Sequence, residues 1–196
     1  MESVRELLVE QMRDLYDAEK QLVKALPKMA KAASNEQLQE AFQNHLKQTQ
    51  EHVQRLERAF EMIGVSAKSK PCAGMKGLVE EGKETLEEDL SEPLLDSAII
   101  CGAQKVEHYE IAGYGTLIAW ANSIGLEEVA QVFEETLQEE KEADEKLTQV
   151  AEEILLKLSE SEGSGEETGM EERTTGAGRK SSAKSAPERS TRRRAS

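Results

Sequence analysis

Two glutamates three residues apart, Glu107 and Glu110, interrupt an apolar stretch of the sequence, AQKVEHYEIAGYG at residues 103–115. Residues three apart lie on the same side of a helix, and a buried carboxylate is costly unless something pairs with it. The hydrophobic spacing places both side chains on or beside the buried face. A cation, a proton or a basic side chain must therefore face them.

The other three long helical patterns also carry polar residues within their apolar stripes. Glu19 interrupts the first, His45 and His52 interrupt the second, and Glu140 and Asp144 interrupt the fourth. Each interruption falls near the middle of its helix, so in an antiparallel bundle the polar side chains meet at a similar height. Carboxylates that converge there repel one another unless cations, protons or a basic partner neutralise them.

Several carboxylates with one or two histidines at the centre of a bundle form a ligand set that iron or manganese accepts. The sequence therefore predicts a metal site with ligands drawn from Glu19, His45, His52, Glu107, Glu110, Glu140 and Asp144. His45 and His52 stand about 10 Å apart along the helix axis, so we expect at most one of them to bind metal directly. His108 is expected to point away from this row.

A simpler explanation exists for any one of these acids. The chain contains 39 Asp and Glu, and some of them will fall at the edge of an apolar stripe while remaining in water. The coincidence on all four helices favours the metal site.

Hydrophobic periodicity predicts four long helices, over about residues 4–32, 35–63, 92–124 and 126–157. Ser34, three residues before Gln37, is the expected start of the second helix as part of a capping box, and Gly64 is its expected end. A short helix is expected at about 75–90, within the connection that begins at residue 65. Short links between the first and second and the third and fourth helices predict antiparallel hairpins. The fold class is therefore an all-α, ferritin-like four-helix bundle with a long crossover connection.

The charge is unevenly distributed along the chain, whose net charge is −14. Residues 173–196 hold eight Arg and Lys and one Glu, whereas the rest is strongly acidic. We expect a bundle domain over residues 1–158 and a disordered tail over 159–196, because that segment is nearly devoid of large hydrophobic residues. The basic end of the tail would either contact nucleic acid or another anionic surface, or simply aid solubility.

Several function classes find no support in the sequence. There is no nucleophile–base–acid arrangement, phosphate-binding loop or Cys/His zinc spacing, and Cys72 and Cys101 read as two free thiols. There is no secretory signal pattern and no run of about 18 apolar residues, so we expect a cytoplasmic protein without a membrane span.

Four stretches resemble the YciE/YciF family of bacterial ferritin-like stress proteins: MRDLYDAEKQL (12–22), HLKQTQEHVQRLE (45–57), AQKVEHYEIAGYGTL (103–117) and EEKEADEKL (139–147). The resemblance covers about residues 4–155 and implies a fold similar to ferritin and rubrerythrin, a homodimer and a link to stress.

The resemblance also implies roles for particular residues. Glu19 matches the single glutamate of the ferritin-like pattern, and Glu107 with Glu110 resembles the Glu-x-x-Glu pair of rubrerythrin-like proteins. The sequence departs from the pattern elsewhere, because none of its three histidines has a glutamate three residues earlier. A site rich in carboxylates and poor in nitrogen follows, which weakens the case for oxidative iron chemistry more than the case for metal binding.

Two functions remain open from the sequence. In the first, two iron or manganese ions, bridged by Glu110 and Glu140, consume peroxide or O₂ or sequester iron; whether the protein is an enzyme stays open. In the second, the protein is a non-enzymatic structural stress protein with a vestigial polar core, and its basic tail contacts nucleic acid or anionic surfaces.

Overall fold

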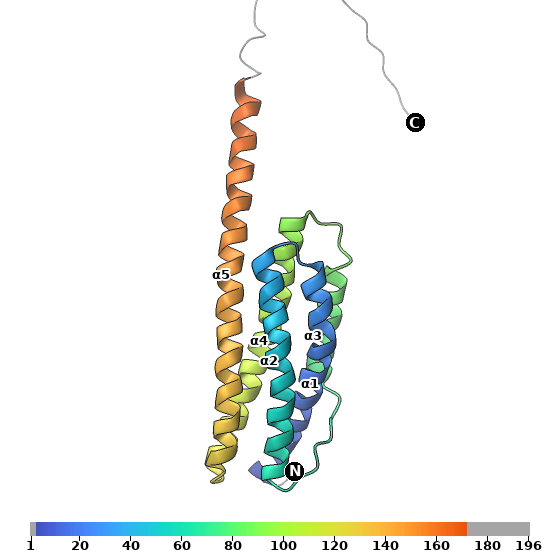
Figure 1. Cartoon of the computed structure of the whole chain (residues 1–196), viewed down its shortest axis with the longest axis vertical. Helices are drawn as coiled ribbons and strands as arrows, with labels where there is room; N and C mark the ends of the chain where they lie inside the picture. Colours follow the sequence, from blue (N-terminus) through green and yellow to red (C-terminus); the bar gives the residue numbers. More distant parts are fainter. Residues whose placement is uncertain (1–2, 172–196) are drawn as a thin grey trace, which may run out of the picture. The chain divides into compact units, whose positions relative to one another are not determined.

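A computed structural model describes the backbone of residues 3–171 and the side chains of residues 3–160. In this part of the chain there are five helices: α1 (Val4–Ala32), α2 (Glu36–Met62), α3 (Ala73–Thr85), α4 (Glu92–Ser123) and α5 (Glu127–Glu171) (Figure 1). Residues up to Ser159 form one compact unit, to which the bundle belongs. The predicted all-α bundle with a crossover connection is confirmed: α1 and α2 form one hairpin, α4 and the start of α5 form the other, and α3 lies in the connection.

The core consists of two apolar clusters separated by a polar layer. One cluster joins the C-terminal part of α1 and the N-terminal parts of α2 and α4, and it includes Leu22, Phe42 and Ile100. The other joins the opposite ends of these helices and includes Leu56 and Leu117. Apart from Asp96, near the start of α4, the buried polar residues of the long helices fall between the two clusters, namely Glu19 on α1, His45, Thr49 and His52 on α2, Glu107 and Glu110 on α4, and Thr136 and Glu140 on α5. The fold therefore brings the mid-helix interruptions of the sequence to one level.

The predicted start of α2 at Ser34 is wrong by one residue. Asn35 is the N-cap, and its side-chain oxygen accepts hydrogen bonds from the backbone N–H groups of Gln37 and Leu38. Ser34 instead donates its N–H and its hydroxyl to the buried carboxylate of Asp96, on α4. The competing partner comes from 62 residues away, and local sequence rules do not include it.

Two helices end at the predicted glycines, whereas α3 and the end of α5 differ from the prediction. Gly64 and Gly125 have φ values of 69° and 74°, the left-handed conformation that glycine adopts after a helix. α3 begins at Ala73 and ends at Thr85, so it lies earlier than predicted, with Cys72 as its N-cap. α5 continues beyond residue 157 to Glu171, and residues 158–171 contain no proline.

Residues 172–196 lie outside the described residues, and with them the basic end of the predicted tail. Its disorder and its contact with nucleic acid or an anionic surface stay predictions. Among the helices of the described residues, none combines the length and the apolar character needed to cross a membrane.

Candidate metal centre

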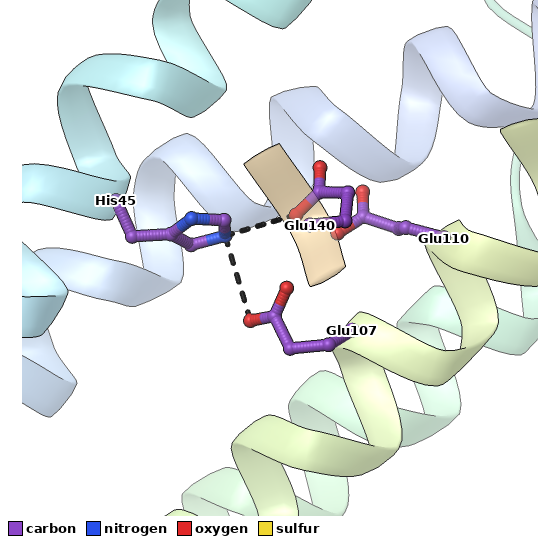
Figure 2. A group of neighbouring side chains, drawn as sticks. All are labelled: His45, Glu107, Glu110 and Glu140. Atoms are coloured by element: carbon purple, nitrogen blue, oxygen red, sulfur yellow. Dashed lines mark ion pairs between the residues drawn. The ribbon is translucent and has the colours of Figure 1, made fainter. Parts of the chain in front are cut away.

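Six of the seven predicted ligands meet in the polar layer, in two groups that share Glu140. One group contains His45, Glu107, Glu110 and Glu140, with one potential ligand atom from each lying within 4.8 Å of all the others (Figure 2). The second group contains Glu19, His52 and Glu140, under the same distance limit. All four long helices contribute, so the centre exists only when the whole bundle is assembled.

The first group is built around the imidazole of His45. Its Nε2 lies 3.5 Å from Oε1 of Glu107 and 3.6 Å from Oε2 of Glu140, as the dashed lines in Figure 2 mark. Glu107 and Glu110 reach this point together from consecutive turns of α4, as their spacing of three residues predicts. At these distances His45 makes no direct hydrogen bond to either glutamate, so a space remains between the potential ligand atoms.

The second group is built around His52, whose two ring nitrogens have different partners. Nδ1 lies 3.5 Å from Oε1 of Glu19 and 3.0 Å from Oε1 of Glu140, while Nε2 lies 2.8 Å from Oε2 of Glu139. Arg55 in turn holds Glu139 with two guanidinium nitrogens, one of them 3.0 Å from Oε1. The Glu139 contact favours the tautomer with the proton on Nε2, which leaves Nδ1 as the ligand atom.

The sequence-based expectation of one binding histidine differs from this arrangement. The ring centroids of His45 and His52 are 6.2 Å apart, although seven residues separate them on α2. Both rings converge on Glu140, one from each side along the helix. Side-chain direction shortens the separation that the backbone rise alone suggests.

Many polar atoms of the centre have no hydrogen-bond partner. Within the described residues, nine buried nitrogen and oxygen atoms of the two groups lack a hydrogen bond, including both oxygens of Glu110 and both ring nitrogens of His45. Two of the nine, Nδ1 of His52 and Oε1 of Glu140, lie 3.0 Å apart as an ion pair. Each unmet buried polar atom costs about 1–3 kcal/mol, and a charged one costs more. The donors are carboxylate oxygens and imidazole nitrogens without sulfur, the combination that iron and manganese accept. The residues present therefore fit the predicted metals.

Burial and mutual repulsion shift the pKa values of these groups. Burial raises the pKa of Glu107 to about 7 and that of Glu140 to about 8. Burial, reinforced by the neighbouring acids Glu19, Glu140 and Glu107, raises the pKa of Glu110 well above its ordinary value. Burial opposes the charged form of His52, but Glu19 and Glu140 outweigh it and raise its pKa to about 11. Without metal, bound protons therefore supply the positive charge that the centre needs.

Three residues around the centre were not predicted from the sequence. The Tyr114 hydroxyl, fully buried on α4, donates a hydrogen bond to Oε1 of Glu19. Glu139 and Arg55 hold His52 from the outer side of the bundle. Tyr114 reads as an ordinary member of an apolar stripe, and Glu139 and Arg55 as surface charges. In the sequence, Glu139 is next to Glu140 and Arg55 is three residues after His52. This proximity is the only local signal of their roles.

Asp144 is the predicted ligand that the structure does not bring into either group. Its Oδ1 accepts a hydrogen bond of 3.0 Å from Gln104, and its Oδ2 lies 3.5 Å from Nε2 of His108. His108 is exposed, as expected. One turn beyond Glu140 on α5, Asp144 faces the edge of the α4–α5 contact and not the interior.

Comparisons with known proteins agree with the fold and with the resemblance read from the sequence. The profile of DUF892, a domain of unknown function, matches residues 3–159. Protein YciF of Escherichia coli (strain K12) is 42% identical over 152 residues, which are 77% of this chain and 92% of YciF.

Solved structures extend the comparison to three dimensions. The crystal structure of the E. coli stress protein YciF matches with a TM-score of 0.78 at 41% identity, over 80% of this chain and 99% of that chain. A protein from Xanthomonas campestris pv. campestris matches with a TM-score of 0.65 at 26% identity, over 82% and 99% of the two chains. The chain therefore belongs to the DUF892 family, and it is similar to YciF in sequence and in fold.

Proposed function

We propose that the protein binds two iron or manganese ions in the buried centre and serves in protection against stress. The buried polar atoms without hydrogen bonds carry the proposal, because cations among the carboxylates would bind most of them. The likeness to the E. coli stress protein YciF supports the physiological setting.

Two positions for metal follow from the two groups. His45, Glu107, Glu110 and Glu140 would hold one ion, and Glu19, His52 and Glu140 the other. Glu140 belongs to both groups and would therefore help to hold both ions. Glu110 belongs to the first group alone, so we assign it to one ion and not to both.

Bound iron or manganese would supply one-electron redox chemistry for consuming peroxide or O₂, or would itself be the stored cargo. The protein's own residues prepare the site for either use. Glu139 orients His52, Tyr114 holds one oxygen of Glu19, and the apolar clusters shield the centre toward both ends of the bundle. Low local water strengthens every electrostatic contact between the carboxylates and a cation.

Metal content and metal-dependent stability test the proposal. The full chain, purified and reconstituted aerobically with Fe²⁺ or Mn²⁺, should retain about two ions per chain by elemental analysis, as a two-group site requires. At 100 times Kd, bound metal should add about 2.7 kcal/mol to the free energy of unfolding per site. Glu140→Ala should abolish most of this gain because both groups lose a ligand.

Glu145→Ala is the matched control, since it removes an exposed acid from the same helix. It should keep both the metal content and the stabilisation. Wild-type protein that retains no iron, manganese or zinc and shows no thermal shift with any of them would sink the proposal in favour of the non-enzymatic structural role.

A further inference from the structure

A cavity between α2 and α5 connects the surface of the bundle with the first metal group. Its volume is about 500 Å³, and among its lining residues are the exposed Glu40, Glu142 and Lys146 and the buried His45 and Glu107. Pockets that admit small ligands measure about 300–1,000 Å³, so a metal ion that keeps its water shell has ample room.

Polar bridges join α2 to α5 on both sides of this cavity. On one side, Gln37 donates to Glu153 at 2.9 Å and accepts from Lys146 at 3.4 Å. On the other side, Arg55 reaches across to Glu139 and Glu135. Between the bridges the two helices face each other with the small residues Ala41 and Ala143 and leave the space above His45 open.

The buried end of the cavity presents atoms that lack partners. His45 is 5% exposed, and neither of its ring nitrogens has a hydrogen-bond partner; Oε2 of Glu107 is also without one. The mouth is acidic, because Glu40 and Glu142 outnumber Lys146, which is engaged with Gln37. A negatively lined cleft raises the local concentration of cations and their rate of entry.

We propose that this cavity is the route by which hydrated divalent cations enter the buried centre, with Glu40 and Glu142 attracting the ion and His45 and Glu107 receiving it. The inference rests on the proposed metal centre. Three other pockets on the described part of the chain are lined by no residue of that centre. One of them, between α1 and α3, measures about 250 Å³, and its charged residues are all lysines.

The rate of metal uptake distinguishes an entry route from a cavity through which no metal passes. The probe is Co²⁺, mixed with metal-free full-length protein in a stopped-flow instrument and followed by its visible absorbance. Ala143→Trp fills the α2–α5 cavity and should slow uptake on the order of tenfold, since entry then needs a higher barrier. EDTA should remove the ion more slowly by a similar factor, so that Kd and stoichiometry stay close to wild type.

Ala25→Trp is the matched control, because Ala25 is half-buried like Ala143 and lines the α1–α3 pocket. It should take up Co²⁺ at the wild-type rate. If Ala143→Trp also takes up Co²⁺ at that rate while remaining folded, the route is overturned and the metal centre stands. If wild-type protein binds neither Co²⁺ nor Fe²⁺ nor Mn²⁺ at equilibrium, the metal centre itself fails.

A second variant decides the matter if Ala143→Trp does not fold. Glu40→Gln with Glu142→Gln keeps the shape of the mouth and removes its charge. Uptake at low ionic strength should fall about tenfold, the lower end of electrostatic steering, and the difference should fade in high salt. An unchanged rate at low salt would overturn the route.

Discussion

Glu110 lies on α4 with no exposed surface, and neither of its carboxylate oxygens has a hydrogen-bond partner. In the metal-free protein the unpaired carboxyl group destabilises the fold, whereas with metal bound the carboxylate serves as a ligand. We expect Glu110→Met to raise the free energy of unfolding by about 1–3 kcal/mol in EDTA, because an unsatisfied buried acid is replaced by an apolar side chain of similar length. With saturating Mn²⁺ the order should reverse, since only wild type gains the full stabilisation.

Urea unfolding with EDTA and with Mn²⁺ measures the stability difference between Glu110→Met and wild type in both conditions. Glu134→Met, an exposed acid on α5, is the control and should stay within about 0.5 kcal/mol of wild type in both conditions. A Glu110→Met variant that is less stable than wild type in EDTA would show that the carboxylate has a structural role of its own.

At the residue scale, helical phase predicted the buried residues of the centre well and the residues around the centre poorly. Glu19, Glu110 and Glu140 are all fully buried, and their position in an apolar stripe predicts that. The phase of Asp144 differs from that of Glu140 by four residues, and one turn was enough to carry it to the edge of the bundle. The role of Tyr114 depends on a contact 95 residues away, which periodicity does not encode.

At the scale of the element, two glycines on α4, Gly113 and Gly115, differ in the space around them. A Cβ on Gly113 would lie 2.8 Å from Cδ2 of the fully buried Leu15, so this glycine allows α1 and α4 to approach. A Cβ on Gly115 would meet nothing within 4 Å. We expect Gly115→Ala to stabilise the protein by about 0.5–1 kcal/mol, the helix propensity of alanine over glycine.

Gly113→Ala makes the same chemical change two residues earlier and serves as the comparison. It should lose the propensity gain, because Leu15 must shift within a packed core. Thermal unfolding in EDTA keeps metal out of the measurement. Equal stabilisation by the two alanines would mean that the close approach of α1 and α4 has no energetic weight.

Helix ends show where local rules fail at this scale. Gly64 and Gly125 were predictable because a left-handed residue after a helix is a local requirement. The start of α2 was not, because Asp96 of α4 takes up the N–H and hydroxyl of Ser34 and leaves the cap to Asn35. The hairpin links and the crossover followed from helix lengths and connection lengths, which is why the bundle was predictable although single caps were not.

The whole molecule separates its two apolar clusters by a layer of acids and histidines, and this division lowers the stability of the metal-free bundle. Each cluster packs its own apolar side chains together on one side of the polar layer. The polar layer is tolerated without metal because its groups bind protons. These groups are the carboxyls of Glu107 and Glu140, whose pKa values burial raises, and the imidazole of His52. Metal and protons therefore compete for the same space.

The competition predicts opposite responses of the metal-free and metal-loaded protein to pH. Glu107, with its pKa raised from 4.5 to about 7, and Glu140, with its pKa raised to about 8, bind more protons when folded than when unfolded. Their stabilisation is complete below pH 4.5 and is lost as the pH rises through 7 and 8. His52 acts in the same direction, from its ordinary pKa of 6.5 up to about 11. Each such group changes the free energy of unfolding by up to about 1.4 kcal/mol per pH unit.

Thermal unfolding between pH 5 and 8.5, in EDTA and with saturating Mn²⁺, measures both responses; the pH range is about that over which these groups titrate. The Tm in EDTA should fall as the pH rises, whereas the Tm difference made by Mn²⁺ should grow, because the ion displaces fewer protons at higher pH. Glu140→Gln removes one titrating carboxyl and a shared ligand, so it should flatten both curves. Glu145→Gln, an exposed acid, should leave both unchanged. A Tm in EDTA that rises from pH 5 to 8 would contradict the assignment, because the folded centre would then hold fewer protons than the unfolded chain.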